Sequence, residues 1–287
     1  MKYNQDWKDY QILRTGKGEK LEKWGNVTLL RPDPQIIWGT EINEKLSDAH
    51  YLRSSSGGGK WKTLKNVPEN WVVGWKNLKF DIKLTGFKHT CLFPEQAVNW
   101  DMMIDLIQKA NRKISVLNLF AYTGGATVAC ASAGANVVHV DAAKNMVERA
   151  KHNARLSGLA DANIRYIVDD CTKFINREIR RGNKYDAIIM DPPSYGRGAN
   201  GEIWKLEENI TEFVELCEKV LSDKPLFVLI NSYTTGLGAT AMENVLRCAL
   251  KGRKGRFESY EVGLPTQEGL VLPCGNSAVF MGEGNGK

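Results

Sequence analysis

Apolar residues after about residue 94 fall into two alternating patterns. Continuous apolar runs of a few residues, bounded by turn signals, are typical of strands buried on both faces. Such runs predict strands at 114–120, 137–140, 164–168, 187–190 and 226–230. Apolar residues at helical spacing predict helices at 94–110, 126–133, 144–157, 172–181 and 206–221. Strands that alternate with helices in this way predict an α/β protein with a doubly wound, mostly parallel sheet.

The first 93 residues show a different pattern of short strand-like runs broken by turn signals. Residues 78–84 alternate apolar and polar side chains, as expected of a strand with one solvated face. The glycine-rich residues 54–59 predict a mobile loop or hairpin tip. The last segment, from about residue 256, favours a closing antiparallel hairpin. We therefore expect a small β-rich domain at 1–93 and an α/β domain at 94–287.

Charge and tryptophan are concentrated near the N-terminus. Residues 1–95 hold 16 Lys and Arg against 11 Asp and Glu, so they contribute +5 of the net charge of +6. Six of the eight tryptophans lie in the first 75 residues. Basic charge mixed with aromatic residues is found in nucleic-acid-binding domains. A small β-rich domain with a tryptophan core and a lysine-rich surface has the same composition, and composition alone favours this second interpretation.

The six cysteines and the N-terminal sequence indicate a cytoplasmic protein. The cysteines are scattered and lie mostly in apolar stretches, which favours reduced thiols over a disulfide framework. No CxxC pair occurs, and the four histidines lack metal-ligand spacing, so we expect no metal site. The N-terminal residues lack the apolar core of a signal peptide, and no apolar run approaches the roughly 18 residues of a membrane span. We expect no membrane partner.

Glycine and acidic residues follow three successive predicted strands. Gly124 and Gly125 follow the first, Asp141 ends the second, and Asp170 follows the third. Ligands of doubly wound sheets bind at the carboxyl ends of the strands. The two glycines permit a tight turn, while Asp141 is placed to accept the hydroxyls of a ribose. The glycines of a GxGxxG dinucleotide motif are absent here, so the pattern favours another nucleoside cofactor.

A second group of candidate residues follows the strand at 187–190. The sequence DPPSY places a carboxylate at Asp191 and two rigid rings at Pro192 and Pro193. The carboxylate and the Pro192 carbonyl would accept hydrogen bonds in fixed directions, and Tyr195 could stack on a planar base. This loop therefore indicates an acceptor platform for a flat, nitrogen-bearing substrate, although prolines can also merely end a strand.

The chain from about residue 80 to residue 280 resembles the class I S-adenosylmethionine-dependent methyltransferases. It is most similar to the branch with the bacterial 23S ribosomal-RNA cytosine-C5 and guanine-N7 enzymes. The matching segments are LNLFAYTGGATVACASAGA with Asp141, then VDDCTKF, then DPPSY, and TGFKHTCLFPEQA resembles a strand that leads into the cofactor site. That branch usually has an acid-Gln-Arg triplet where this chain has Glu95-Gln96-Ala97, so the contact of the arginine has no counterpart.

The resemblance implies a Rossmann-like fold, S-adenosylmethionine as cofactor, S-adenosylhomocysteine as product, and no metal. It implies cofactor contacts from Phe93, Gln96, Phe120, Tyr122, Thr123, Gly124, Gly125, Asp141, Ala142, Asp170, Cys171 and Asp191. It implies catalytic roles for Asp191, Pro192 and Tyr195. An RNA substrate would be contacted by Ser194, Tyr195, Arg197, Lys60 and Trp61.

Cytosine-C5 methylation needs a cysteine thiolate that adds to the ring. Ser194 and residues 231–236 occupy the places where the RNA cytosine enzymes carry it, and Cys274 lies on the terminal hairpin. We therefore expect methylation of an RNA base, ribosomal and at nitrogen. Two alternatives stay open: a small-molecule or protein side-chain methyltransferase, and a non-catalytic RNA-binding protein of the same fold. A nicotinamide-dependent oxidoreductase is the least expected, and the oligomeric state is open.

Overall fold

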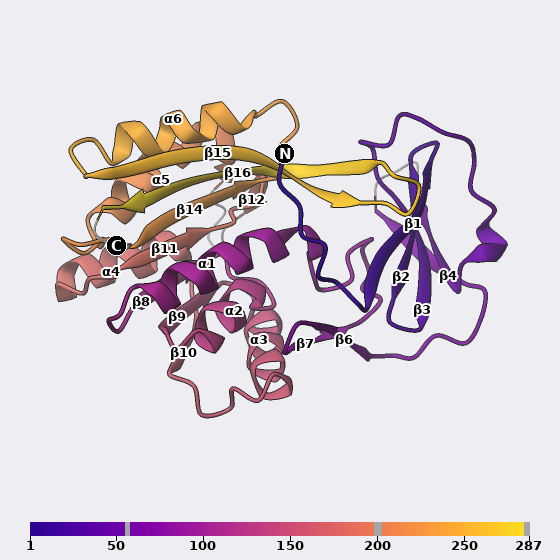
Figure 1. Ribbon diagram of the computed structural model, residues 1–287, viewed down its shortest axis with the longest axis horizontal. Helices are drawn as coiled ribbons and strands as arrows, with labels where there is room; N and C mark the ends of the chain where they lie inside the picture. The colour runs from indigo at the N-terminus through magenta and orange to yellow at the C-terminus, as the bar shows by residue number, and fades with distance from the viewer. Residues whose placement is uncertain (55–57, 198–202, 284–287) are drawn as a thin grey trace. The chain divides into compact units, whose positions relative to one another are not determined.

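The computed structural model describes residues 1–54, 58–197 and 203–283, which form two compact units (Figure 1). The α/β unit comprises residues 1, 99–262 and 275–287. The β-rich unit comprises residues 2–98 and 263–274, so the tip of the terminal hairpin belongs to it. The domain boundary expected after residue 93 lies near residue 98, where the longer segment of the β-rich unit ends.

The α/β unit is built on a seven-stranded sheet with the strand order β10-β9-β8-β11-β14-β16-β15. Strands β8 to β11 and β14 are parallel, and β16 pairs with β14 antiparallel. The expected doubly wound fold with a closing hairpin is therefore confirmed. The strands are β8 (Ser115–Leu119), β9 (Asn136–Asp141), β10 (Ile164–Val168), β11 (Ala187–Met190), β14 (Phe227–Ser232), β15 (Gly255–Pro265) and β16 (Val271–Gly282).

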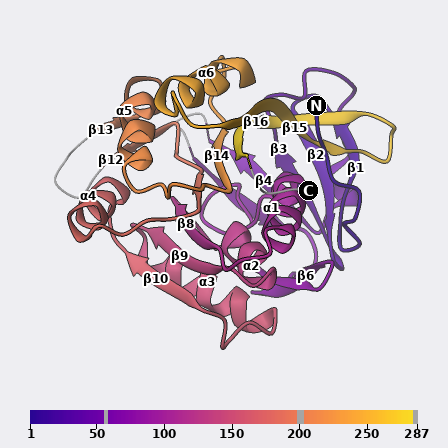
Figure 2. The ribbon, with the colours of Figure 1, turned by 60° about the vertical axis from the view of Figure 1, so that its left-hand side comes forward.

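Helices cover both faces of this sheet (Figure 2). The helices are α1 (Ala97–Lys109), α2 (Gly125–Ser132), α3 (Lys144–Leu156), α4 (Cys171–Arg181), α5 (Leu206–Glu218) and α6 (Ala239–Ala249). Buried side chains of α4, α5 and α6 form one core with the strands, in which Ile188, Met190 and Ile230 are almost fully buried. The first three helices lie on the other face. Because both faces are covered, β11 and β14 are buried at every position and lack polar alternation.

Two elements of the α/β unit were not expected from the sequence. Helix α6 is one, although Met242, Val245, Leu246 and Ala249 have the helical spacing that would have revealed it. The other is a two-stranded ribbon of β12 (Tyr195–Arg197) and β13 (Ile203–Lys205). Strands of three residues are too short to show a period-two pattern.

The β-rich unit contains a five-stranded sheet with the order β1-β2-β3-β4-β5 and a separate two-stranded sheet. Neighbouring strands are antiparallel except for β3 and β4. Trp24 and Trp75 are fully buried, so tryptophan does form the core of this unit. The strands are β1 (Tyr10–Gly16), β2 (Glu19–Trp24), β3 (Val27–Pro32), β4 (Ala49–Arg53), β5 (Gly59–Thr63), β6 (Trp71–Trp75) and β7 (Leu78–Ile82), with short 3-10 helices at Glu44–Leu46 and Pro94–Gln96. The loop expected at 54–59 joins β4 to β5, and its residues 55–57 lie outside the described residues.

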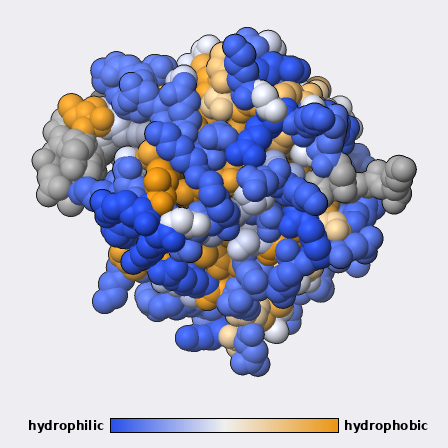
Figure 3. Space-filling view, turned by 90° about the vertical axis from the view of Figure 1, so that its left-hand side faces the viewer, coloured by the Kyte–Doolittle hydropathy of each residue, from blue (hydrophilic) through white to orange (hydrophobic). Residues whose placement is uncertain are grey.

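Figure 3 shows one face of the surface of the protein. The face shown in Figure 3 is mostly hydrophilic, with apolar side chains in small separate groups. Within residues 1–54, 58–197 and 203–283, no helix is long and apolar enough to span a bilayer. All six cysteines are free.

Candidate active site

The carboxyl ends of five parallel strands meet at one edge of the α/β sheet. The register pairs Leu119 of β8 with Val140 of β9 on one side and with Met190 of β11 on the other. The residues that directly follow, Phe120, Asp141 and Asp191, therefore share this edge. The structure thus brings together three of the residues that the sequence selected from separate strand ends.

The turn after β8 has an unusual backbone. Phe120 and Tyr122 have φ angles of 54° and 49°, and Gly124 has a φ of 81°. A residue with a side chain pays roughly 1–2 kcal/mol to adopt this left-handed region. Two neighbouring groups hold the turn, because the Phe120 amide donates to Cys171 Sγ at 3.3 Å and the Tyr122 amide donates to Asp141 Oδ2 at 2.8 Å. Such enforced conformations cluster at ligand-binding sites.

Asp141 shapes this edge with both of its carboxylate oxygens. Its Oδ2 accepts from the Tyr122 amide, and its Oδ1 accepts from the Ala143 amide at 2.8 Å. Burial raises the pKa of Asp141, and the two backbone hydrogen bonds oppose this shift. Each oxygen keeps a second lone pair, so the carboxylate can still accept from a ligand hydroxyl. The neighbouring Ala142 is exposed.

Asp170 and Cys171 both have local structural contacts. Asp170 Oδ1 accepts from the Lys173 amide at 2.9 Å and so caps the N-terminus of α4. Cys171 is 4% exposed, and burial raises the pKa of its thiol to about 12. A thiol with this pKa stays protonated near neutral pH, so Cys171 supports the turn and is no nucleophile.

Close packing explains the two glycines of this turn. A Cβ atom on Gly124 would lie 2.7 Å from Ala150 Cβ of α3, and the φ angle of Gly124 also favours glycine. A Cβ atom on Gly125 would lie 2.7 Å from Trp100 Cζ2 of α1. Both glycines therefore let helix α2 approach its neighbours, a constraint separate from any ligand contact. Thr123, between Tyr122 and Gly124, is buried.

The DPPSY loop is held in place by the ribbon and by the loop after β14. The Trp204 indole N–H of β13 donates to the Pro193 carbonyl at 2.7 Å. Thr234 Oγ1 donates to Ser194 Oγ at 2.7 Å. The Pro192 carbonyl, in contrast, receives no hydrogen bond from the described part of the chain. The Pro193 carbonyl is thus occupied, whereas the carbonyl of Pro192, a buried residue, has no such partner. Tyr195 of the same loop is 51% exposed.

Aromatic contacts join this loop to the turn after β8. The ring centroids of Trp204 and Phe120 are 5.6 Å apart. The ring centroid of Phe213 in α5 lies 5.5 Å from that of Trp204 and 5.3 Å from that of Phe120. Sequence reasoning missed Trp204, because its neighbours in the chain show no pattern. The position of a lone tryptophan 13 residues after Asp191 was the one available signal.

A buried polar network adjoins Asp191 on the next strands. Asn231 directly follows Ile230, the register partner of Met190, and pairs across with Ser277 of β16. Asn231 Oδ1 accepts from Asn99 Nδ2 at 3.2 Å and from Ser277 Oγ at 2.8 Å. The hydroxyl of Tyr260 donates to Asn99 Oδ1 at 2.7 Å. Sequence analysis had considered residues 231–236 only for a cysteine and missed this amide.

The remaining candidates lie elsewhere or beyond the description. Phe93 and Gln96 flank or end the 3-10 helix Pro94–Gln96 of the β-rich unit, and Gln96 is buried. Lys60 and Trp61 lie on β5 of that unit, where strand alternation directs them to opposite faces. Arg197 lies in β12, and its side chain is outside what the structure describes.

The family comparison matches most of the chain. A model of the S-adenosylmethionine-dependent methyltransferase family matches residues 19–242. A crystal structure of the SAM-dependent methyltransferase from Agrobacterium tumefaciens is 33% identical, with a TM-score of 0.91 over 97% of this chain and 92% of that chain. A second SAM-dependent methyltransferase, from Streptococcus mutans, has a TM-score of 0.75 at 16% identity over 97% and 76% of the chains, which shows the fold alone.

Curated relatives match shorter stretches. Ribosomal RNA large subunit methyltransferase K/L from Shewanella frigidimarina is 34% identical over 156 residues, 54% of this chain and 21% of that protein. Ribosomal RNA large subunit methyltransferase I from Aeromonas hydrophila is 40% identical over 81 residues, 28% of this chain and 20% of that protein. The matches thus span about a fifth of the length of these relatives. With the family model covering residues 19–242, the chain belongs to the S-adenosylmethionine-dependent methyltransferases.

Proposed function

We propose that this enzyme methylates a nitrogen atom of an RNA base, with ribosomal RNA as the substrate class. The observation that carries the proposal is the shared strand edge, where the DPPSY loop follows the strand beside the turn at Phe120. The names of the curated relatives, which are ribosomal RNA methyltransferases, support the substrate class. A ribosomal substrate would also place the enzyme in the cytoplasm.

The residues at the edge fit S-adenosylmethionine. Asp141 has lone pairs left for the ribose hydroxyls. The first intrahelical hydrogen bond of α2 runs from the Val128 amide to the Gly124 carbonyl, and the amides of Gly125 and Ala126 have no partner among the described residues. Such amides at a helix N-terminus bind carboxylates, here that of the methionine part.

Further cofactor contacts are proposed on the strength of the family resemblance. The rings of Phe120 and Tyr122 would face the sulfonium, a permanent cation that aromatic faces stabilise. Asp170 and Cys171 would border the adenine. Thr123 and Ala142 would complete the site within the α/β unit, and Phe93 and Gln96 stay predicted cofactor contacts on the resemblance alone.

The DPPSY loop would align the substrate. Bound S-adenosylmethionine supplies an already activated methyl group. Asp191 and the Pro192 carbonyl would accept the N–H hydrogens of the base, which directs the nitrogen lone pair and holds the departing proton at the Asp191 carboxylate. Tyr195 would stack on the base, a contact of about 1–3 kcal/mol. Ser194, Arg197, Lys60 and Trp61 are proposed to contact the rest of the RNA.

Three buried thiols of the α/β unit, those of Cys130, Cys171 and Cys217, favour nitrogen over cytosine C5. Cytosine-C5 chemistry needs a thiolate. Cys171, the thiol at this edge, is buried and accepts a hydrogen bond from the Phe120 amide. Burial likewise raises the pKa of Cys130 and Cys217, which lie in the helical layers. None of these three thiols is prepared for nucleophilic attack.

The test combines cofactor binding with methyl transfer. Purified protein is titrated calorimetrically with S-adenosylmethionine and S-adenosylhomocysteine, and tritiated-methyl transfer to total bacterial RNA is then measured. Asp191→Asn keeps one acceptor oxygen for the cofactor, so it is expected to change cofactor affinity little, whereas it lacks the carboxylate that holds the proton and should lose transfer. Asp223→Asn removes an exposed carboxylate of the same unit and is the matched control.

Each outcome separates the proposed function from its alternatives. Label in RNA that disappears in Asp191→Asn but not in Asp223→Asn supports base methylation, and mapping of the labelled nucleotide identifies the atom. Cofactor binding without label in RNA favours a small molecule or a protein as substrate. RNA binding without cofactor binding favours the non-catalytic protein of the same fold.

A further inference from the structure

A buried ion pair lies within the five-stranded sheet of the β-rich unit. Glu22 of β2 is fully buried, and its carboxylate accepts from Arg31 Nε and Nη2 of β3 at 2.5 and 2.9 Å. The hydroxyl of Tyr10 donates to the same carboxylate at 2.6 Å. Burial alone would raise the pKa of Glu22, but Arg31 and Lys20 outweigh burial and hold this pKa at about 2. The carboxylate is therefore ionised and its charge is compensated.

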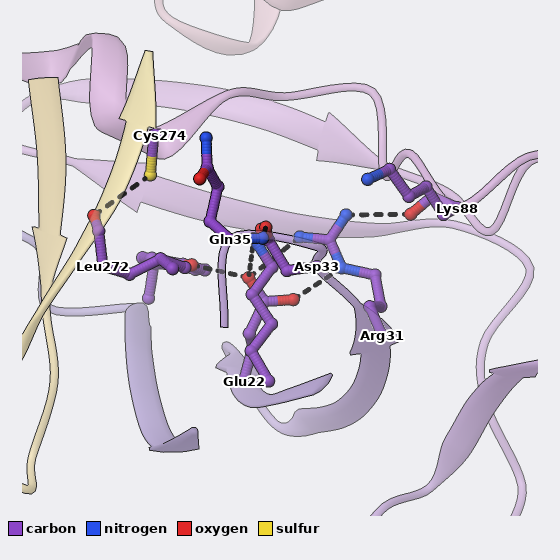
Figure 4. Close-up of polar contacts among 9 residues, drawn as sticks. Glu22, Arg31, Asp33, Gln35, Lys88, Leu272 and Cys274 are labelled. Atoms are coloured by element: carbon purple, nitrogen blue, oxygen red, sulfur yellow. Dashed lines mark hydrogen bonds and ion pairs between the residues drawn. The ribbon is translucent and has the colours of Figure 1, made fainter. Parts of the chain in front are cut away.

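Arg31 also fixes a turn that covers this face of the sheet. Its third nitrogen, Nη1, donates to the Lys88 carbonyl at 2.9 Å (Figure 4). The Trp61 indole N–H of β5 donates to the carbonyls of Thr85 and Phe87 at 2.9 and 3.3 Å. Two side chains of the sheet thus hold residues 85–89 in place.

The strand register shows which cations lie on the covered face. Leu29 pairs with Ala49, Tyr51 pairs with Trp61, and side chains two residues apart share a face. The covered face therefore carries Arg31, Trp61 and, at the end of β4, Arg53. Lys20 belongs to the same face, because it pairs with Arg31 in register.

Lys88 and Arg53 are the cations around this turn that lack the compensation of Arg31 and Lys20. His89 on the turn is neutral near pH 7, because burial and the charges of Lys88 and Arg31 lower its pKa to about 4. Lys20 Nζ lies 3.1 Å from Asp33 Oδ2. Lys88, Arg53 and His89, in contrast, have no side-chain hydrogen bond or carboxylate partner within the described parts of the chain. Lys88 is nevertheless half-buried, and burial lowers the pKa of its ammonium. Asp33 raises this pKa, whereas the charges of Lys20 and Arg53 lower it further.

Gathering uncompensated cations costs free energy unless an anion joins them. A half-buried ammonium has lost part of its hydration, and neighbouring positive charges repel it further. The fully committed guanidinium of Arg31 cannot move toward an anion, whereas Lys88 and Arg53 can each donate to one. Phe87 precedes Lys88 on the same turn, and its side chain is 67% exposed.

We propose that Lys88, Arg53 and His89 form a phosphate-binding site, the Lys88 site, which holds a phosphate group of the RNA backbone while Phe87 stacks on an adjacent base. A free nucleotide has the same phosphate chemistry and is the other source of this ligand. The RNA source rests on the proposed function, whereas the phosphate site itself does not.

The test measures binding of a short fluorescein-labelled single-stranded RNA to the full chain by anisotropy, across about 50 to 200 mM salt. Lys88→Gln and Arg53→Gln each remove one phosphate contact. A contact to single-stranded RNA contributes a slope of about 0.7 in log K against log salt, or roughly fivefold in affinity near 0.1 M salt. Lys23→Gln is the matched control, because Lys23 is exposed and points to the opposite face of β2 from Glu22.

A second arm distinguishes the two sources of phosphate. Binding of AMP and of inorganic phosphate is measured by calorimetry on the same variants, and S-adenosylmethionine binding is measured in parallel. RNA affinity that falls about fivefold in Lys88→Gln and Arg53→Gln, but not in Lys23→Gln, supports the site with RNA as its ligand. Unchanged RNA affinity with lost AMP binding in Lys88→Gln supports the site with a free nucleotide.

Two results would overturn the Lys88 site. One is equal RNA, AMP and phosphate binding in the wild type and Lys88→Gln. The other is an equal loss of RNA affinity in Lys88→Gln and Lys23→Gln, which would mean that net charge alone matters. Intact S-adenosylmethionine binding in the same samples shows that such a failure concerns this site and leaves the methyltransferase function standing.

Discussion

Replacement of Asp141 by asparagine tests the cofactor site most directly, because the shape of the side chain is preserved. The carboxylate accepts from the Tyr122 and Ala143 amides, both at 2.8 Å. An asparagine amide has one acceptor oxygen, so its NH₂ group must face one of these two N–H donors. The variant thus loses a hydrogen bond that holds the turn, as well as the negative charge offered to the ribose hydroxyls.

The structure sets the scale of the expected loss. A hydrogen bond to a charged acceptor contributes about 1.5–3 kcal/mol. Loss of one such bond to the ribose predicts an affinity for S-adenosylmethionine that is about 10- to 150-fold weaker in Asp141→Asn. Asp141→Ala removes the acceptors of both loop amides and should bind at least as weakly.

Acidification should have the same effect on the wild type. Protonated Asp141 has one oxygen that donates, so it no longer accepts from two amides and a ligand together. Because burial raises the pKa of Asp141, S-adenosylmethionine affinity should fall at a higher pH than the ordinary aspartate pKa of 3.8 would predict. Asp141→Asn should lack this component of the pH dependence.

Isothermal titration calorimetry with S-adenosylmethionine and S-adenosylhomocysteine is the assay, together with thermal unfolding of each variant. Asp161→Asn is the control, since Asp161 is exposed in the same unit and has no partner among the described residues. A folded Asp141→Ala protein that binds the cofactor as tightly as the wild type would refute the placement of Asp141 at the ribose.

Three further changes test the packing around the two units. Trp204→Phe keeps an aromatic ring but loses the N–H that donates to the Pro193 carbonyl. Turnover should therefore fall about 2- to 12-fold, the equivalent of about 0.5–1.5 kcal/mol, while cofactor affinity stays unchanged. Wild-type rates in a methyl-transfer assay would contradict this expectation. Gly125→Ala places a methyl group against Trp100 and should cost about 1–3 kcal/mol of unfolding free energy in urea denaturation, whereas Gly86→Ala, with open space around it, should change this free energy little. The pKa of Glu22 is about 2 in the folded state against an ordinary 4.5, so its ionised form contributes about 3 kcal/mol to the unfolding free energy above pH 4.5. This contribution should be lost as the pH falls toward 2. An unfolding free energy that changes equally with pH in the wild type and in Glu22→Gln would disprove this role of Glu22.

The fold of the α/β unit was largely predictable because burial leaves a local trace. Strands β11 and β14 are covered on both faces, so they are continuous apolar runs that are visible in any short window of sequence. The helix expected at 144–157 ends at Leu156, with Gly158 in the left-handed conformation after it. The placement of Phe120, Asp141 and Asp191 at one edge follows from parallel pairing alone.

The supporting contacts of the site were not predictable, because their partners are far apart in the chain. Asn99 and Asn231 are 132 positions apart, and only the packing of α1 against the sheet brings their amides together. The occupied Pro193 carbonyl likewise depends on Trp204 from a ribbon whose strands are too short for a pattern.

Sequence alone therefore determined the class of fold, the order of most strands and helices, and the residues at the strand ends. These features arise from periodic burial and from backbone constraints of glycine and proline, which act over a few residues. The tertiary structure decided which polar groups are already committed to protein partners and which stay open to a ligand. The Arg31 guanidinium and Lys88 ammonium show this difference. Both are cations near one turn, and only the guanidinium has side-chain partners among the residues that the structure describes. Hydrogen-bond commitment depends on three-dimensional neighbours, and no local pattern of residues encodes it.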